Sequence, residues 1–141
     1  MRKLNLHFLD STDKTVELSP IEKILHEYGQ EIYDYAKGYF NYIVTTTSFA
    51  DEISGASLYI IVPEIGYDYK ILELSYKDVE NVNLKFFTLK TEQVENDIVS
   101  IHGDDWSLVR ARISHLLNTD LADSTFRFLI NQVHLKRNTN E

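Results

Sequence analysis

The sequence predicts an α+β domain, in which an antiparallel β-meander of four central strands follows one helix and precedes two more. Three observations predict this class. A capped amphipathic segment comes first, and four runs rich in β-branched and aromatic residues follow it. The links between those runs are too short for a crossover helix, so the strands should be antiparallel and mostly sequential. The helices pack most simply on one face of the sheet.

The first residues predict a small N-terminal hairpin. Residues 3–9 alternate between apolar and polar side chains, residues 11–14 are turn formers, and residues 15–18 suit a short return strand. The length of 141 residues suits a single domain over residues 1–141.

The first helix has the clearest local signal. Ser19-Pro20-Ile21-Glu22 is a capping box with proline at the first helical position, and Gly38 suits a left-handed helix end. These signals predict a helix over about residues 20–37. One broad apolar stripe should face the core, formed by Ile21, Ile24, Leu25, Tyr28, Ile32, Tyr35, Ala36 and Tyr39. Tyr33 lies off this stripe and should be exposed.

The four predicted strands are Phe40–Thr47, Ala56–Val62, Tyr69–Tyr76 and Val82–Lys90. Residues 92–101 fit either a further strand or a short helix. A second helix should run from Asp104-Asp105-Trp106 to about Leu117, and a third over residues 122–135. Residues 136–141 should form a loose tail.

The composition makes several functions improbable. The 14 basic and 22 acidic residues give a formal net charge of −8, which disfavours nucleic acid and anionic membranes as partners. The chain has no cysteine, which excludes disulfides, thiolate metal ligands and cysteine nucleophiles. Neither a signal peptide nor a membrane-spanning stretch is recognisable, so we expect a cytoplasmic protein.

No catalytic or phosphate-binding motif occurs. Sequences of the types GxxxxGK[ST], GxGxxG, GxSxG and HExxH are absent, so we assign no catalytic residue, no metal ligand and no cofactor. The nearest metal or acid–base cluster is His102-Gly103-Asp104-Asp105. Helix capping by Asp104 or Asp105 explains the same residues without a ligand. An enzyme is therefore the less favoured class.

Acidic residues without neighbouring bases give the main functional signal. Residues 38–69 and 91–109 contain neither lysine nor arginine. In a meander, the turn at 63–68 shares one end of the sheet with the exit from the fourth strand. Exposed tyrosine beside acid is typical of protein-binding surfaces. The candidate partner-binding patch comprises Glu64, Tyr67, Asp68, Tyr69, Glu92, Glu95 and Asp97.

These observations favour a small acidic, non-enzymatic protein-binding module that occludes a basic protein partner. Immunity proteins of bacterial toxins, antitoxins and phage-encoded inhibitors are similar in size, charge and lack of motifs. The similarity is one of class, and no family motif is matched residue by residue.

Two alternatives stay open. The stretch Val62–Lys70 resembles the acid-then-D/E-x-K layout of restriction-type nucleases, which would imply a metal-dependent enzyme using Glu64, Asp68 and Lys70. The two acids are only four residues apart around one turn, and Glu73-Leu74-Ser75 lacks the lysine of an E-x-K. The other alternative is an accessory domain that forms a homodimer.

Overall fold

The computed structural model describes residues 19–49, 52–87 and 93–139. It confirms the predicted α+β class: one helix precedes a five-stranded antiparallel sheet and two helices follow it. The elements are α2 (Pro20–Tyr35), β1 (Asn41–Phe49), β2 (Glu52–Val62), the short 3-10 helix η1 (Pro63–Ile65), β3 (Tyr67–Asp78), β4 (Asn81–Phe87), β5 (Gln93–Ser100), α3 (Ser107–Leu117) and α4 (Asp120–Thr139). The N-terminal hairpin expected over residues 3–18 lies outside the described residues.

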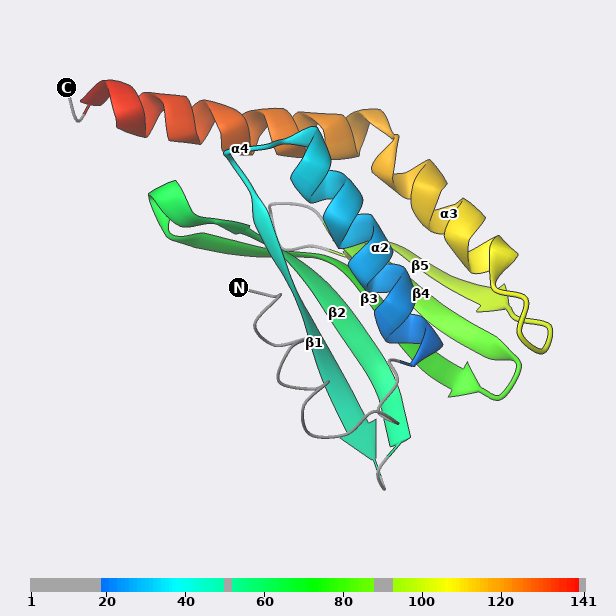
Figure 1. Cartoon of the computed structure of the whole chain (residues 1–141). Coiled ribbons are helices and arrows are strands. Elements are labelled where there is room, and N and C mark those ends of the chain that lie inside the picture. Colours follow the sequence, from blue (N-terminus) through cyan, green and yellow to red (C-terminus); the bar gives the residue numbers. More distant parts are fainter. Residues whose placement is uncertain (1–18, 50–51, 88–92, 140–141) are drawn as a thin grey trace.

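The strands follow one another across the sheet in the order β1-β2-β3-β4-β5, so every link is a hairpin connection between neighbours. Figure 1 shows α2 and α3 on one face of this sheet and α4 crossing one end of it. Helix α2 packs on β1 and β2, α3 contacts β4 and β5, and α4 contacts η1 and α3. None of the described helices is long and apolar enough to cross a membrane.

The hydrophobic core lies between the sheet and the three helices. Its fully buried side chains come from α2, from β2 to β4, and from α3 and α4. The largest of them are Ile21, Ile24, Leu25, Leu58, Ile60, Ile71, Leu72, Leu74, Leu84, Ile113 and Leu129. Burial of these side chains is the main favourable term for the fold.

A β-bulge in β3 lets the central strand bury both of its halves. Leu58 pairs with Leu72 and Tyr59 pairs with Lys70, so Ile71 is the extra residue. Ile71 and Leu72 are adjacent and both fully buried. The alternation of buried residues thus changes phase at the bulge, since a strand without it would turn one half outward.

The start of α2 agrees with its prediction. Ser19 Oγ accepts a hydrogen bond from the Glu22 backbone N–H at 3.2 Å, and the Ser19 N–H donates to Glu22 Oε1 at 3.2 Å. The helix ends at Tyr35, two residues before the predicted end. Gly38 takes the left-handed conformation in the following turn, with φ of +86°.

Two other expectations about helices need correction. Tyr35 was expected in the core, but 66% of its surface is exposed. Tyr35 is the last residue of α2 and lines an open pocket, whereas Ala36, also expected on the stripe, is buried as predicted. Residues 136–139 were expected in a loose tail, but α4 continues to Thr139. The ambiguous segment 92–101 contains a strand, β5, paired with β4.

Close packing of α2 on β1 depends on Gly29, and this gives a stability prediction. A Cβ atom at this position would lie 2.4 Å from Tyr42 Cδ2. Alanine is the better helix former by about 1 kcal/mol, yet we expect Gly29→Ala to destabilise the protein by about 1–3 kcal/mol through overpacking. Urea unfolding followed by circular dichroism measures the change.

The double variant with Tyr42→Ala is the control. Removing the ring should make Gly29→Ala neutral or stabilising when compared with Tyr42→Ala alone. Equal destabilisation in both backgrounds would show that the Tyr42 ring does not cause the effect.

Candidate functional site

The residues of the predicted patch lie in two places, some around the β2–β3 turn and others on β5. As expected, the turn around η1 and the link from β4 to β5 lie at the same end. However, pairing of β3 with β4 begins only at Leu72, opposite Phe86. Within the described residues, the stretch from Tyr67 to Ile71 has no ladder partner on β4, so Glu64 and Asp68 lie past the end of the β3–β4 ladder.

Glu64 is already neutralised within the chain. Arg137 of α4 donates two hydrogen bonds to its carboxylate, from Nε to Oε2 at 2.8 Å and from Nη2 to Oε1 at 2.6 Å. The guanidinium carbon lies 5.2 Å from the centroid of the Tyr39 ring, and Tyr39 Oη shares a 3.0 Å hydrogen bond with His134 Nε2. The hydrogen bond from Arg137 lowers the pKa of Glu64.

The tyrosines beside Asp68 mainly support the sheet, by stacking on each other and by a hydrogen bond to β4. Tyr69 is buried, and its hydroxyl donates a 2.5 Å hydrogen bond to the Phe87 carbonyl. Burial raises the pKa of this hydroxyl. The half-buried Tyr67 ring stacks on Tyr69 with centroids 6.5 Å apart. Tyr69 therefore has little surface to offer a partner, whereas Asp68, which lies between the two tyrosines in the sequence, is exposed.

Asp97, the described acid of the patch on β5, faces the helices. Asp97 is opposite the buried Leu84 and forms an ion pair with Arg112 of α3. Glu95 occupies a β5 position opposite Phe86, and its side chain lies outside the description. Glu92 also lies outside the described residues. Of the described carboxylates in the predicted patch, Asp68 alone lacks an ion pair.

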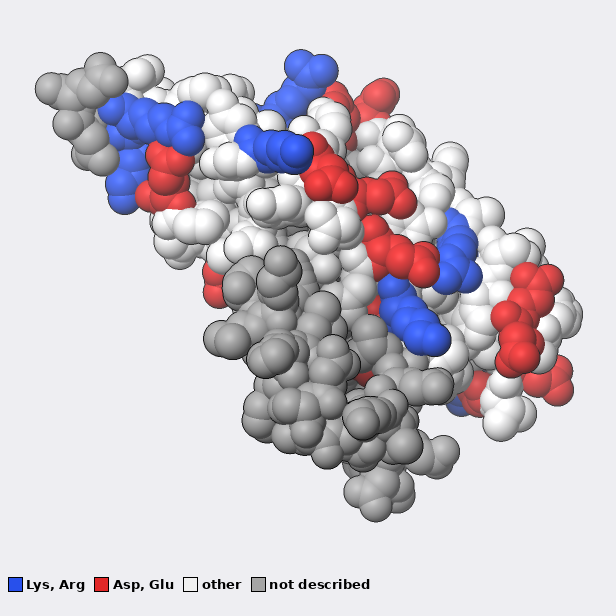
Figure 2. All heavy atoms as spheres, viewed as in Figure 1, with Lys and Arg blue, Asp and Glu red and all other residues white. Residues whose placement is uncertain are grey.

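A second acidic surface lies on α2. Glu27, Glu31 and Asp34 are spaced i, i+4 and i+7, which puts them on one side of the helix. Figure 2 shows acidic side chains following one another over α2. Arg110 of α3 pairs with Glu27 at 3.0 Å. Within the described part of the chain, Glu31 and Asp34 have no ion pair, and Gln30 Nε2 donates to Asp34 at 3.1 Å. We call Glu31, Asp34 and the adjoining Tyr35 the acidic α2 face.

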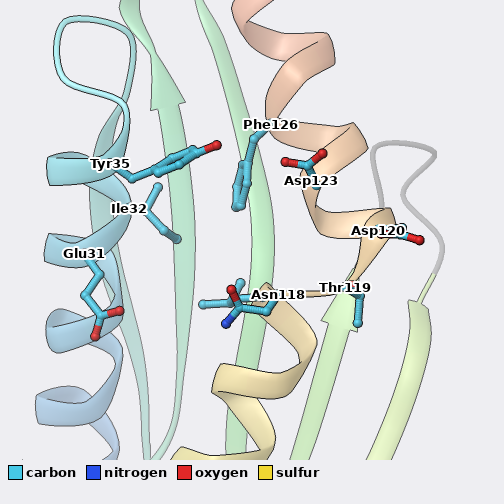
Figure 3. Close-up of a pocket in the computed structure, with 9 residues that line it drawn as sticks. Glu31, Ile32, Tyr35, Asn118, Thr119, Asp120, Asp123 and Phe126 are labelled. Atoms are coloured by element: carbon cyan, nitrogen blue, oxygen red, sulfur yellow. The ribbon is translucent and has the colours of Figure 1, made fainter.

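This face borders an open pocket of about 350 Å³ between α2 and the turn that joins α3 to α4. Tyr35 and Phe126 form an aromatic wall, with ring centroids 6.3 Å apart and planes tilted by 53°. Figure 3 shows the Tyr35 hydroxyl and the Asp123 carboxylate pointing toward one another, while Asp120 points away from Tyr35. The lining residues are Glu31, Ile32, Tyr35, Leu117, Asn118, Thr119, Asp120, Asp123 and Phe126.

The chemistry of the pocket favours a cationic group over a cofactor. Its volume is at the lower end of the range for ligand pockets, so it suits one side chain better than a large ligand. Asp123 pairs with Arg127 at 2.7 Å. Thr119 Oγ1 accepts from the Ala122 N–H at 3.3 Å and caps α4, so Asp120 is not needed as the cap. An exposed tyrosine ring next to carboxylates can hold a guanidinium or ammonium group.

The structure offers no support for the nuclease alternative. Glu64 is held by Arg137, and Lys70 pairs with Glu73 at 3.0 Å. Among the residues that the structure describes, no group of three or more His, Cys, Asp or Glu side chains is arranged to hold a metal ion.

The second helix was expected to begin at residues 104–106 with Asp104 or Asp105 as its cap, but α3 begins at Ser107 and its N-cap residue is Trp106. Asp105 accepts a 3.0 Å hydrogen bond from the Ser107 N–H. Hydrogen bonds with the side chain and the backbone of Ser107 lower the pKa of Asp105.

The acidic α2 face was missed in the sequence, although a signal for it exists. Between Lys23 and Lys37 the chain has Glu27, Glu31 and Asp34 and neither lysine nor arginine. Helical spacing places these acids on one side. This window is shorter than the windows 38–69 and 91–109.

The Glu64–Arg137 pair gives a prediction about pH. In the folded chain the pKa of Glu64 lies below its ordinary value. The stabilisation that the pair gives the folded state is therefore fully present at pH values above the ordinary pKa and is lost as pH falls through the folded pKa. We expect Arg137→Met to return the pKa of Glu64 toward the ordinary range. Carboxyl ¹³C NMR between about pH 2 and 7 measures it. Arg127→Met, on the same helix, should leave Glu64 unchanged.

The chain was compared with known proteins at the level of families, individual sequences and folds. No family model, no curated protein and no solved structure matches it.

Proposed function

We propose that this chain is a small non-enzymatic binding module and that its acidic α2 face engages a basic protein partner. The observation that carries the proposal is the exposed pair Glu31 and Asp34 beside the exposed ring of Tyr35 at an open pocket. Three features of a protein-binding surface are thereby adjacent: uncompensated charge, an aromatic anchor and a concave site.

The ion pairs of the chain favour this surface over the sheet end. Arg137 and Arg112 neutralise Glu64 and Asp97 of the predicted patch, while Glu31 and Asp34 have no basic neighbour in an ion pair among the described residues. A basic partner therefore gains more by approaching α2 than by competing with two internal arginines for the acids of the sheet end.

Binding would proceed in two physical stages. The net charge of −8 raises the encounter rate with a basic protein, most strongly at low salt. An arginine or lysine of the partner then lies against the Tyr35 ring, with the carboxylates of Glu31 and Asp123 at the rim of the pocket. A partner whose basic surface binds a polyanion would be inhibited by occlusion, the mode of action of immunity-type proteins.

Charge removal on α2 tests the location of the site. We expect Glu31→Gln with Asp34→Asn to slow association with a fluorescein-labelled Arg-Gly repeat peptide about three- to tenfold at low salt, because charge steering is lost. Stopped-flow fluorescence at low and high salt measures the rates, which should converge at high salt.

The matched control is Asp68→Asn with Glu80→Gln, which removes the same charge from exposed positions on β3 and the β3–β4 turn. Its association rate should change less than about twofold. Equal slowing by both double variants would mean that only net charge matters and that α2 is not the site.

The aromatic anchor is tested separately by Tyr35→Ala. Because charge is unchanged, the association rate should be retained while dissociation accelerates about 5- to 30-fold, corresponding to about 1–2 kcal/mol at an anchor residue. Tyr33→Ala is the control, because Tyr33 is on the same helix but does not line the pocket. A dissociation rate that is unchanged by Tyr35→Ala would remove the pocket from the binding site.

A further inference from the structure

The pocket beside the acidic α2 face combines an aromatic wall with carboxylates on two different helices. Tyr35 and Phe126 form the wall, with ring centroids 6.3 Å apart, and Figure 3 shows these rings side by side between α2 and α4. Glu31 lines the pocket from α2, and Asp123 lines it from α4. A ligand of matching chemistry has a positive head with several hydrogen-bond donors and a face that stacks on a ring.

Two helices end at this pocket and add to its negative character. The last residue of α2, Tyr35, and the last residue of α3, Leu117, both line it. The carbonyl end of a helix carries partial negative charge, which a basic side chain in the last turn offsets. The last turn of α2 has no basic residue and contains Asp34. The positive end of α4 also lies here, but its first turn holds two carboxylates, Asp120 and Asp123.

Asn118 supplies a further oxygen acceptor in the turn between α3 and α4. Its side-chain Nδ2 donates to the Ser114 carbonyl at 2.7 Å, which fixes the orientation of the amide. The side-chain oxygen has no hydrogen-bond partner among the described residues, and Asn118 lines the pocket. Three parts of the chain, α2, this turn and α4, therefore each bring an oxygen acceptor to the same pocket.

We propose that this pocket is selective for arginine, so that the basic partner inserts an arginine side chain and a lysine is a poor substitute. The inference rests on the proposed function and adds the chemical class of the inserted group. A guanidinium is planar and stacks on the Tyr35 ring, while its five N–H donors reach acceptors on several sides. An ammonium is a compact and strongly hydrated charge, which keeps its water in an open pocket.

The chain itself uses arginine for the carboxylates around the pocket. Arg127 donates from Nε to Asp123 at 2.7 Å, and Arg110 donates two hydrogen bonds to Glu27, one turn before Glu31. The Arg127 side chain is 74% exposed and binds one of the two oxygens of Asp123. An exposed pair between residues i and i+4 contributes little stability, so the partner's arginine can share or take this carboxylate.

Two peptides of equal length and charge test the selectivity, a fluorescein-labelled Arg-Gly repeat and the matching Lys-Gly repeat. Charge governs steering, so both peptides should associate with the whole chain at rates within about twofold of each other. We expect the Lys-Gly peptide to dissociate about 3- to 10-fold faster, because its ammonium groups lack the planar contact with Tyr35. Stopped-flow fluorescence measures both rates.

The Tyr35→Leu variant locates the selectivity, because leucine is uncharged and apolar but has no aromatic face. In this variant the dissociation rates of the two peptides should come within about twofold of each other. Tyr33→Leu is the control on the same helix, outside the pocket lining, and should keep the difference seen in the native chain. Far-UV circular dichroism checks that both variants are folded.

Equal dissociation of the two peptides from the native chain would overturn the selectivity. A difference that persists in Tyr35→Leu would also overturn it, because the preference would then arise away from the pocket. Either result leaves the proposed function standing if Glu31→Gln with Asp34→Asn still slows the association of both peptides. If that double variant slows neither peptide, the proposed function fails, and the selectivity of the pocket fails with it.

Discussion

The change of phase within β3 is the constraint on which the rest of the fold depends. This strand is central in the sheet, and its first and second halves both contribute buried side chains. They can do so because Ile71 is inserted opposite the Leu58–Tyr59 step of β2. Without that residue, one half of the central strand would present its apolar residues to the uncovered face and charged residues such as Lys70 to the helices. The core under α2 and the core under α3 would then not be continuous.

The elements of the fold were largely predictable because their signals are local. Ser19 and Glu22 start α2 through contacts that involve only neighbouring residues. The segment 92–101 was ambiguous because its apolar residues fit two periods. It becomes a strand through pairing with β4, an interaction between segments that periodicity does not report. Tyr35 was misplaced because it is the last residue of α2 and lies at the open pocket beside Phe126, a tertiary position that helical periodicity does not report.

The candidate site was less predictable, because ion pairs form between distant parts of the chain. A window without lysine or arginine has no base close in sequence, but Arg137 reaches Glu64 across 73 positions and Arg112 reaches Asp97 across 15. Both arginines come from helices that fold onto the sheet. Conversely, the acids of α2 have bases nearby in sequence, Lys23 and Lys37, yet the helix turns Glu31 and Asp34 to a side without an ion pair in the described residues. Charge compensation is thus a property of the tertiary arrangement.

The extension of the β2–β3 hairpin past β4 has a consequence for dynamics. The tip of the hairpin, from η1 to Ile71, has no ladder partner on β4 among the described residues. Helix α4 contacts this tip at η1. The Glu64–Arg137 pair joins this tip to the last turns of α4. Opening of either segment removes a neighbour of the other, so the two should open as one cooperative unit below the free energy of global unfolding. Amide hydrogens of the hairpin tip and of the C-terminal half of α4 should then report one shared free energy of opening, although they belong to different elements of the chain.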